Sequence, residues 1–147
     1  MLHLYLTDDH NDFLLLFLTG LNVFLTFAMK RTLVLGASLN PSRYSNLVIH
    51  SLLKKGAEVF ALGNKEGLVE SVEIQTEKFA IPNLDVITLY LNPKRQVEYY
   101  DYIIELNPKR VIFNPGTENM ELVELLRDNN ITYELACTLV LLSTNQY

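Results

Sequence analysis

Short apolar runs alternate along the chain with stretches in which apolar residues recur at helical spacing. Thr32–Leu35 and Glu58–Leu62 are apolar runs of strand length, and a glycine follows each of them. Between them, Ser45–Lys55 places valine, isoleucine and leucine residues at helical spacing and ends before Gly56, where a left-handed helix cap belongs. This segment therefore predicts a strand–helix–strand unit.

The same alternation continues through the rest of the chain. The pattern predicts strands at Asp85–Leu91, Arg110–Phe113 and Ile131–Glu134, and helices at Lys94–Leu106 and Asn119–Asn129. Gly67–Ala80 fits neither pattern, although a short strand around Val72–Ile74 is expected. Because right-handed crossovers place successive helices against a parallel sheet, the fold class is α/β. We predict a single domain with a doubly wound parallel sheet of Rossmann type.

The first 28 residues differ from this pattern. Phe13–Ala28 contains sixteen residues without a charge, which is shorter than the roughly 18–20 apolar residues of a membrane-spanning helix. We favour an apolar extension over residues 1–28 that lies upstream of a natural start at Met29. A membrane anchor and an accessory helix packed on the domain are the alternatives. The predicted domain then covers residues 29–147.

Composition and charge narrow the function classes. The chain is 49% apolar and 20% charged, as in globular proteins, and its single cysteine and three histidines cannot form a structural zinc site or a disulfide scaffold. Of the net charge of −5, three negative charges lie in the first 28 residues, so the domain carries −2. Its basic residues are scattered in pairs, so nucleic acid is not an expected partner. If the apolar run inserts into a membrane, Lys30–Arg31 after it favours a cytoplasmic position for the domain, and the domain is expected to be cytoplasmic without insertion as well. The oligomeric state stays open.

The loop after the first predicted strand has the composition of an anion site. The nicotinamide fingerprint needs glycines where Ser38 and Pro41 stand, and the P-loop needs a glycine and a lysine at Pro41 and Ser42. Instead, serine hydroxyls and the Arg43 guanidinium surround a helix N-terminus, which suits a pyrophosphate. In the alternative interpretation, Ser42 or Ser45 caps the helix and Arg43 is solvated.

The other loops at the carboxyl ends of the strands are also candidates, because open parallel sheets bind ligands there. Asn64 and Lys65 follow the second strand, and a cation at this position suits a ribose that carries a phosphate, although Glu66 beside it is equally consistent with a surface turn. Leu91–Lys94 and Asn114–Asn119 each lead into a helix. Thr117 could cap the second of these helices.

Four motifs together resemble the stand-alone CoA-binding domain family, which is related to the nucleotide-binding domain of the succinyl-CoA synthetase alpha subunit. They are Gly36-Ala37-Ser38 with Pro41, Arg43, Tyr44, Ser45 and Asn46; Asn64-Lys65; Leu91-Asn92-Pro93; and Asn114–Asn119 followed by Cys137. The resemblance covers nearly all of residues 30–147. It implies that the first motif cradles the CoA pyrophosphate, that the second lies near the adenosine end, and that the third flanks the adenine or the start of the pantetheine. It implies these binding residues: Gly36, Ala37, Ser38, Pro41, Arg43, Ser45, Asn64, Lys65, Leu91, Asn92, Pro93, Asn114 and Gly116.

We therefore expect a non-catalytic domain that binds CoA or an acyl-CoA. His50 lies within a helix and Cys137 is a lone thiol, so both are interpreted as structural residues, as is Tyr99. Two alternatives remain. One is an NADP-dependent oxidoreductase with Lys65 on the 2′-phosphate, and the other is a protein-interaction module that has lost its ligand.

Overall fold

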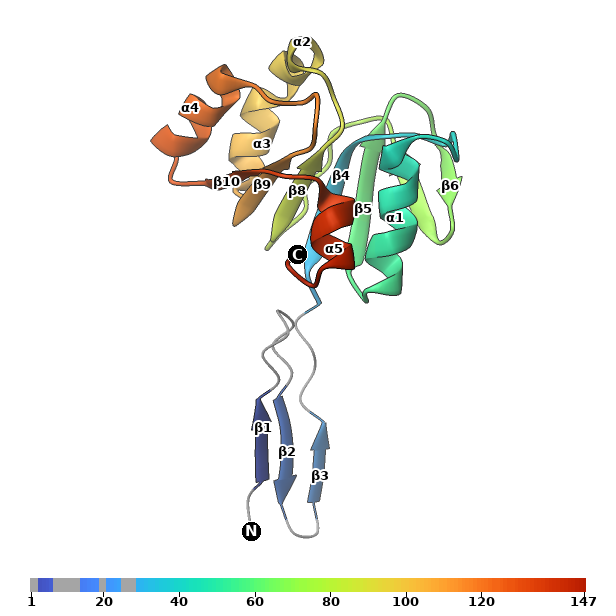
Figure 1. The fold of residues 1–147 in the computed structure, drawn as a ribbon, viewed down its shortest axis with the longest axis vertical. Helices are drawn as coiled ribbons and strands as arrows, with labels where there is room; N and C mark the ends of the chain where they lie inside the picture. The colour runs from blue at the N-terminus through green and yellow to red at the C-terminus, as the bar shows by residue number, and fades with distance from the viewer. Residues whose placement is uncertain (1–2, 7–13, 19–20, 25–28) are drawn as a thin grey trace.

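A computed structural model describes residues 3–6, 14–18, 21–24 and 29–147 (Figure 1). Residues 31–135 form a seven-stranded sheet in the order β10-β9-β8-β4-β5-β7-β6. The strands are β4 (Arg31–Ala37), β5 (Glu58–Gly63), β6 (Gly67–Val69), β7 (Val72–Gln75), β8 (Val86–Leu89), β9 (Arg110–Phe113) and β10 (Thr132–Leu135). All neighbouring pairs are parallel except β6–β7, which is antiparallel. The α/β prediction is thus confirmed.

The central strand β4 marks the point where the chain changes direction across the sheet. Leu33 pairs with Phe60 of β5 on one side and with Ile87 of β8 on the other. From β4 the chain runs outward through β5 and the β6–β7 hairpin, and then returns to β8 and continues to β9 and β10. The loops after β4 and β8 therefore diverge at the carboxyl edge, which is where such sheets bind nucleotides.

Helices cover both faces of the sheet, as doubly wound folds require (Figure 1). They are α1 (Tyr44–Lys54), α2 (Pro93–Gln96), the 3₁₀ turn η1 (Val97–Tyr99), α3 (Tyr100–Leu106), α4 (Met120–Asp128) and α5 (Thr138–Ser143). Successive residues of β4 point to opposite faces. Leu33 and Leu35 pack with α3 and α4, whereas Val34 packs with α1 and with Leu142 of α5. Apolar side chains on both faces explain the uninterrupted apolar run of β4.

Most predicted elements are present with boundaries within one or two residues. Within residues 29–147, the exceptions are the continuous helix predicted at Lys94–Leu106, which is divided into α2, η1 and α3, and two elements that the pattern did not predict, β6 and α5. The division follows the Gln96 side chain, which is fully buried and bonded to loop carbonyls instead of facing water.

The described part of the first 28 residues forms a small antiparallel sheet of β1 (His3–Leu6), β2 (Leu14–Leu18) and β3 (Leu21–Phe24). The accessory helix considered for the apolar segment is therefore wrong at residues 14–18 and 21–24, which are strands. Residues 13, 19–20 and 25–28 of that segment lie outside the described residues. Among the residues that were described, no helix has the length and apolar character to cross a membrane.

Candidate functional site

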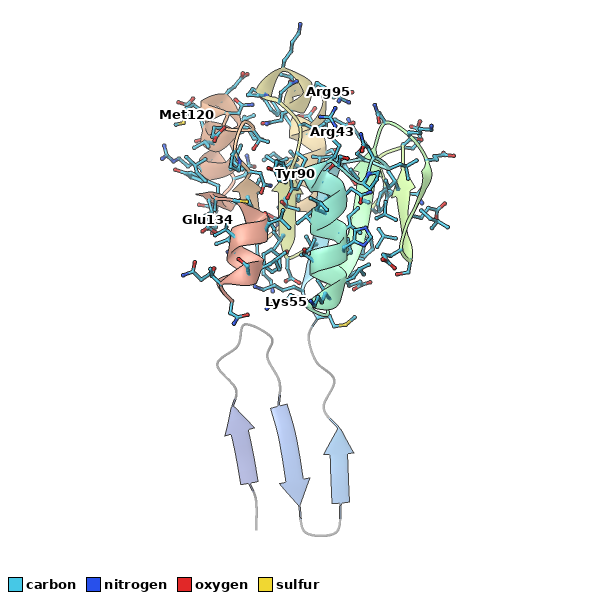
Figure 2. All side chains as sticks on the ribbon, turned by 45° about the vertical axis from the view of Figure 1, so that its right-hand side comes forward. Arg43, Lys55, Tyr90, Arg95, Met120 and Glu134 are labelled. Carbon is cyan, nitrogen blue, oxygen red and sulfur yellow. The ribbon has the colours of Figure 1, made fainter. Side chains whose placement is uncertain are left out.

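A cavity of about 380 Å³ opens at the carboxyl edge of the sheet, between the loops that follow β4, β5, β8 and β9. It is lined by Gly36, Ala37, Ser38, Arg43, Tyr44, Ser45, Leu62, Gly63, Asn64, Tyr90, Leu91, Asn92, Arg95, Tyr99, Pro115, Gly116 and Thr117. Figure 2 shows Arg43 and Arg95 at this end of the domain, with Lys55 at the opposite end. The cavity therefore lies at the point where the strand order reverses.

Two glycines allow backbone segments to pack closely together at the floor of the cavity. Gly36 has φ +96°, and a Cβ atom there would lie 2.9 Å from the carbonyl carbon of Tyr90 and 3.0 Å from Leu91 Cδ2. At Gly63, a Cβ atom would lie 2.3 Å from the carbonyl oxygen of Ala37. Larger residues at either position would push the strand ends apart. The two glycines thus bring the loops of β4, β5 and β8 together around one space.

The N-terminus of α1 faces this space without a side-chain cap. Arg43 is the N-cap residue, and its side chain accepts no hydrogen bond from the helix. The loop instead folds on itself, since Asn40 N–H donates to Ser38 Oγ at 3.1 Å and Ser42 N–H donates to Asn40 Oδ1 at 2.9 Å. The capping role considered for Ser42 or Ser45 is therefore wrong. The uncapped N–H groups remain suited to an anion.

A chain of hydrogen bonds holds the loop between β4 and α1 in place. The Nδ2 of Asn46, which is only 3% exposed, donates to the carbonyl oxygen of Ser38 at 2.9 Å. His50 Nε2 lies 3.2 Å from Asn46 Oδ1, and His50 Nδ1 lies 2.9 Å from Glu70 Oε1. Asn46 and His50 are four residues apart and so share one face of α1. The loop is thus tied to its own helix and, through His50, to the β6–β7 turn.

The opposite wall of the cavity begins with α2. Asn92 caps this helix, because its Oδ1 accepts from Arg95 N–H at 3.0 Å. The buried Gln96 then joins three loops. Its Nε2 donates to the carbonyl oxygens of Leu91 at 2.8 Å and Thr117 at 2.7 Å, and its Oε1 accepts from Asn119 Nδ2 at 3.0 Å. The loops after β8 and β9 therefore form one rigid wall that carries Arg95.

The charge of the lining is positive. Arg43 and Arg95 are exposed, and the lining contains no aspartate or glutamate among the described residues. Within residues 29–147, neither arginine forms a salt bridge. Two unpaired guanidinium groups from opposite walls are suited to an anionic ligand.

Two tyrosines contribute hydroxyl groups that stay protonated. Burial raises the pKa of Tyr99, Glu98 adds to the rise, and the charge of Arg95 opposes it. Burial also raises the pKa of Tyr90, although Thr88 and Thr138 lie close enough to oppose this. Those two threonines bond to each other at 2.8 Å, and the shielded Tyr90 hydroxyl has no partner of good geometry in the described part of the chain.

Nine of the thirteen predicted binding residues line the cavity, and four lie outside its lining: Pro41, Lys65, Pro93 and Asn114. Asn114 is buried, and its amide is committed to the protein. Its Nδ2 donates to Thr88 Oγ1 and to the Leu89 carbonyl, and its Oδ1 accepts from Thr138 N–H. The role of these thirteen residues in binding stays a prediction.

Sequence reasoning missed Arg95 and Tyr99 as lining residues, and it interpreted Tyr99 as a packing residue. The signal for Arg95 was present, because Asn92 followed by Pro93 predicts a helix start and thereby places Arg95 in the first turn, at the ligand edge. It also misassigned one cap. Asn119 caps α4 by accepting from Leu122 N–H, whereas the Thr117 hydroxyl donates to the Asn114 carbonyl at 2.7 Å.

Comparison with known proteins places this geometry in a family. A crystal structure of an uncharacterized protein is 47% identical, with a TM-score of 0.79, over 82% of this chain and 99% of its own. A hypothetical protein from Pyrococcus horikoshii OT3 is 27% identical, with a TM-score of 0.66, over 75% of this chain and 78% of its own. No curated protein matches the chain.

A more distant structure shows the same fold within a larger enzyme. The dinucleotide forming acetyl-coenzyme A synthetase 1 of Ca. Korarchaeum cryptofilum, solved with phosphate and ADP, is 14% identical with a TM-score of 0.61. The match covers 74% of this chain and 26% of that protein. The family described as CoA binding domain matches residues 30–143. Since this match covers most of the sequence, the chain belongs to the CoA binding domain family.

Proposed function

We propose that the protein binds CoA or an acyl-CoA, with the pyrophosphate at the uncapped start of α1 and against Arg43. The observation that carries this proposal is the cavity at the reversal of the strand order, whose lining joins a free helix N-terminus to two unpaired arginines and holds no carboxylate among the described residues. Family membership supplies the ligand class. Helix N-termini and guanidinium groups are the usual protein partners of pyrophosphates.

The proposal is for binding rather than for catalysis. The cavity lining contains no histidine, cysteine, aspartate or glutamate within the described residues. His50 is bonded to Asn46 and Glu70 on the side of α1, and Cys137 precedes α5 outside the lining. We also propose that the domain is cytoplasmic, since the basic pair Lys30–Arg31 favours that side of the membrane if the apolar segment inserts.

Calorimetry with CoA, acetyl-CoA, NADPH and ATP tests this proposal. We expect CoA or acetyl-CoA to bind most tightly and to raise the melting temperature, since a ligand that binds only the folded state stabilises it. Tighter binding of NADPH would instead support the oxidoreductase alternative. If none of the four ligands binds, the proposal is wrong and the protein-interaction alternative gains support.

The variant Arg43→Ala tests the pyrophosphate position. Charge-assisted contacts contribute about 1.5–3 kcal/mol, so the variant should bind CoA roughly ten- to a hundredfold more weakly. Its melting temperature should stay close to that of the wild type, because the side chain is exposed and forms no salt bridge within residues 29–147. Lys54→Ala removes one positive charge at the other end of the same helix and serves as the control. Equal affinities in both variants would contradict the assignment.

A further inference from the structure

Arg43 and Arg95 both line the cavity. A pyrophosphate bound at the start of α1 against Arg43 leaves Arg95 without a role. Arg95 lies on the wall formed by α2, whereas Arg43 belongs to the loop that precedes α1. The two arginines therefore come from loops that diverge on either side of the strand reversal. A ligand that lies across this reversal meets two separate positive groups.

The surroundings of Arg95 fix its backbone and leave its side chain free. Its own N–H is bonded to Asn92 Oδ1 and to the Asn92 carbonyl, each at 3.0 Å, so the backbone N–H has no free hydrogen for a ligand. The next residue, Gln96, is fully buried and bonded to the loops after β8 and β9. Arg95 can therefore contact an anion through its guanidinium and not through its backbone N–H.

The alternative cation for this part of the ligand is less well placed. Lys65, which the sequence assigned to the adenosine end, lies outside the cavity lining, whereas Arg95 and the adjacent Tyr99 both line it. Burial and Glu98 keep the Tyr99 hydroxyl protonated, so it can donate a hydrogen bond beside Arg95. Arg95 and Tyr99 together offer a planar cationic fork and a neutral donor, which suit the terminal oxygens of a phosphate monoester.

We propose that Arg95 binds the phosphate monoester on the ribose of a CoA-type nucleotide, and that it makes the site selective for the 3′-phosphorylated form. This inference rests on the CoA-binding function proposed above. CoA carries both a pyrophosphate and a 3′-phosphate, whereas 3′-dephospho-CoA carries the pyrophosphate alone. Arg43 thereby binds the pyrophosphate at one wall of the cavity, and Arg95 binds the 3′-phosphate of the same ligand at the other wall.

Calorimetry tests whether the two arginines bind different anionic groups. The full chain is titrated with CoA and with 3′-dephospho-CoA at one ionic strength. The wild type should bind CoA about ten- to a hundredfold more tightly, the range of one charge-assisted contact. Arg95→Ala should remove this preference by weakening CoA binding while leaving 3′-dephospho-CoA binding within about twofold of its wild-type affinity. Arg43→Ala should weaken both ligands by the same factor, because both carry the pyrophosphate.

Lys94→Ala is the matched control, since Lys94 is the exposed neighbour of Arg95 and lies outside the cavity lining. It should keep the wild-type preference. Equal weakening of both ligands by Arg95→Ala would overturn the inference, and so would an unchanged preference in that variant. Neither result would contradict the proposed function, which is that the wild type binds CoA. Failure of the wild type to bind either ligand would instead overturn the proposed function, and this inference with it.

Discussion

The amide nitrogen of Asn46 donates a 2.9 Å hydrogen bond to the carbonyl oxygen of Ser38, across eight residues of chain. Asn46 lies in the first turn of α1 and is buried, so this bond is shielded from water. It connects the helix to the loop whose Ser38 and Arg43 line the cavity. Asn46 therefore positions the proposed pyrophosphate loop without lining the cavity itself.

Asn46→Ala should lower both stability and affinity. The variant leaves the Ser38 carbonyl without its buried donor, which costs about 1–3 kcal/mol in the free energy of unfolding. It also releases the loop, so CoA binding should weaken severalfold. Urea denaturation and calorimetry measure the two effects.

His50→Ala is the matched control, because it removes the outer link of the same chain of bonds and keeps the bond between Asn46 and Ser38. The His50 side chain is 44% exposed, so its loss should cost less than about 1 kcal/mol. Losses of equal size in the two variants would show that the chain of bonds acts as a unit.

The sequence predicted the strands that are buried on both faces. β4, β5 and β9 each contain an uninterrupted apolar run after a charged first residue, because helices cover both sides of the sheet, and such runs are visible without any tertiary information. The β6 strand has three residues and lies at the sheet edge, where no alternation can develop. The six-residue helix α5 is also too short to show a polar stripe.

The candidate site was predictable on one wall and not on the other. The loop after β4 is a continuous segment, so its serines and Arg43 could be read together. The opposite wall depends on Gln96, whose partners include the Thr117 carbonyl, 21 residues along the chain. Helical periodicity assigns such a glutamine to the solvent face, and only the packing of three loops shows that it is buried.

Gly36→Ala should be more destabilising than Gly56→Ala. Both glycines have positive φ, at +96° and +80°, so an alanine at either position costs about 1–2 kcal/mol in backbone strain. A Cβ atom at Gly56 meets nothing within 4 Å, whereas at Gly36 it meets the backbone of Tyr90 at 2.9 Å. The clash should cost about 1–3 kcal/mol more, as overpacking usually does. Equal losses in denaturant unfolding would show that the β8 loop moves away freely.

Acid should destabilise the domain partly through Asp85. Burial raises the pKa of this carboxyl, but hydrogen bonds from Arg31 N–H and Lys109 Nζ, at 2.8 and 2.9 Å, and the Lys109 charge outweigh it, so the pKa is lowered. The unfolded chain takes up this proton near pH 3.9, and the folded chain does so only at lower pH. The stabilisation is therefore complete above about pH 5 and is lost as the pH falls through the folded pKa.

Asp85→Asn removes this titration. The free energy of unfolding of the variant should fall less between pH 5 and pH 3 than that of the wild type, as measured by urea denaturation at each pH. The amide oxygen can still accept from Arg31 N–H, so the variant should fold. Identical slopes in the two proteins would show that Asp85 contributes nothing to the acid response.

Gln96→Leu tests whether the second wall must be rigid for recognition. The substitution conserves most of the side-chain volume but leaves the carbonyls of Leu91 and Thr117 without their Gln96 donor. It also removes one of the two acceptors of Asn119 Nδ2, which keeps its bond to the Tyr100 hydroxyl. Each unpaired buried group costs about 1–3 kcal/mol, so the melting temperature should fall by several degrees.

The same substitution should also affect recognition. The N–H of Arg95 keeps its bond to Asn92, but the turn that carries Arg95 is no longer joined to the β9 loop. The preference for CoA over 3′-dephospho-CoA should therefore shrink, while the affinity for 3′-dephospho-CoA, held by the wall of Arg43, changes little. A variant that is less stable yet keeps the full preference would show that the network of Gln96 serves folding alone.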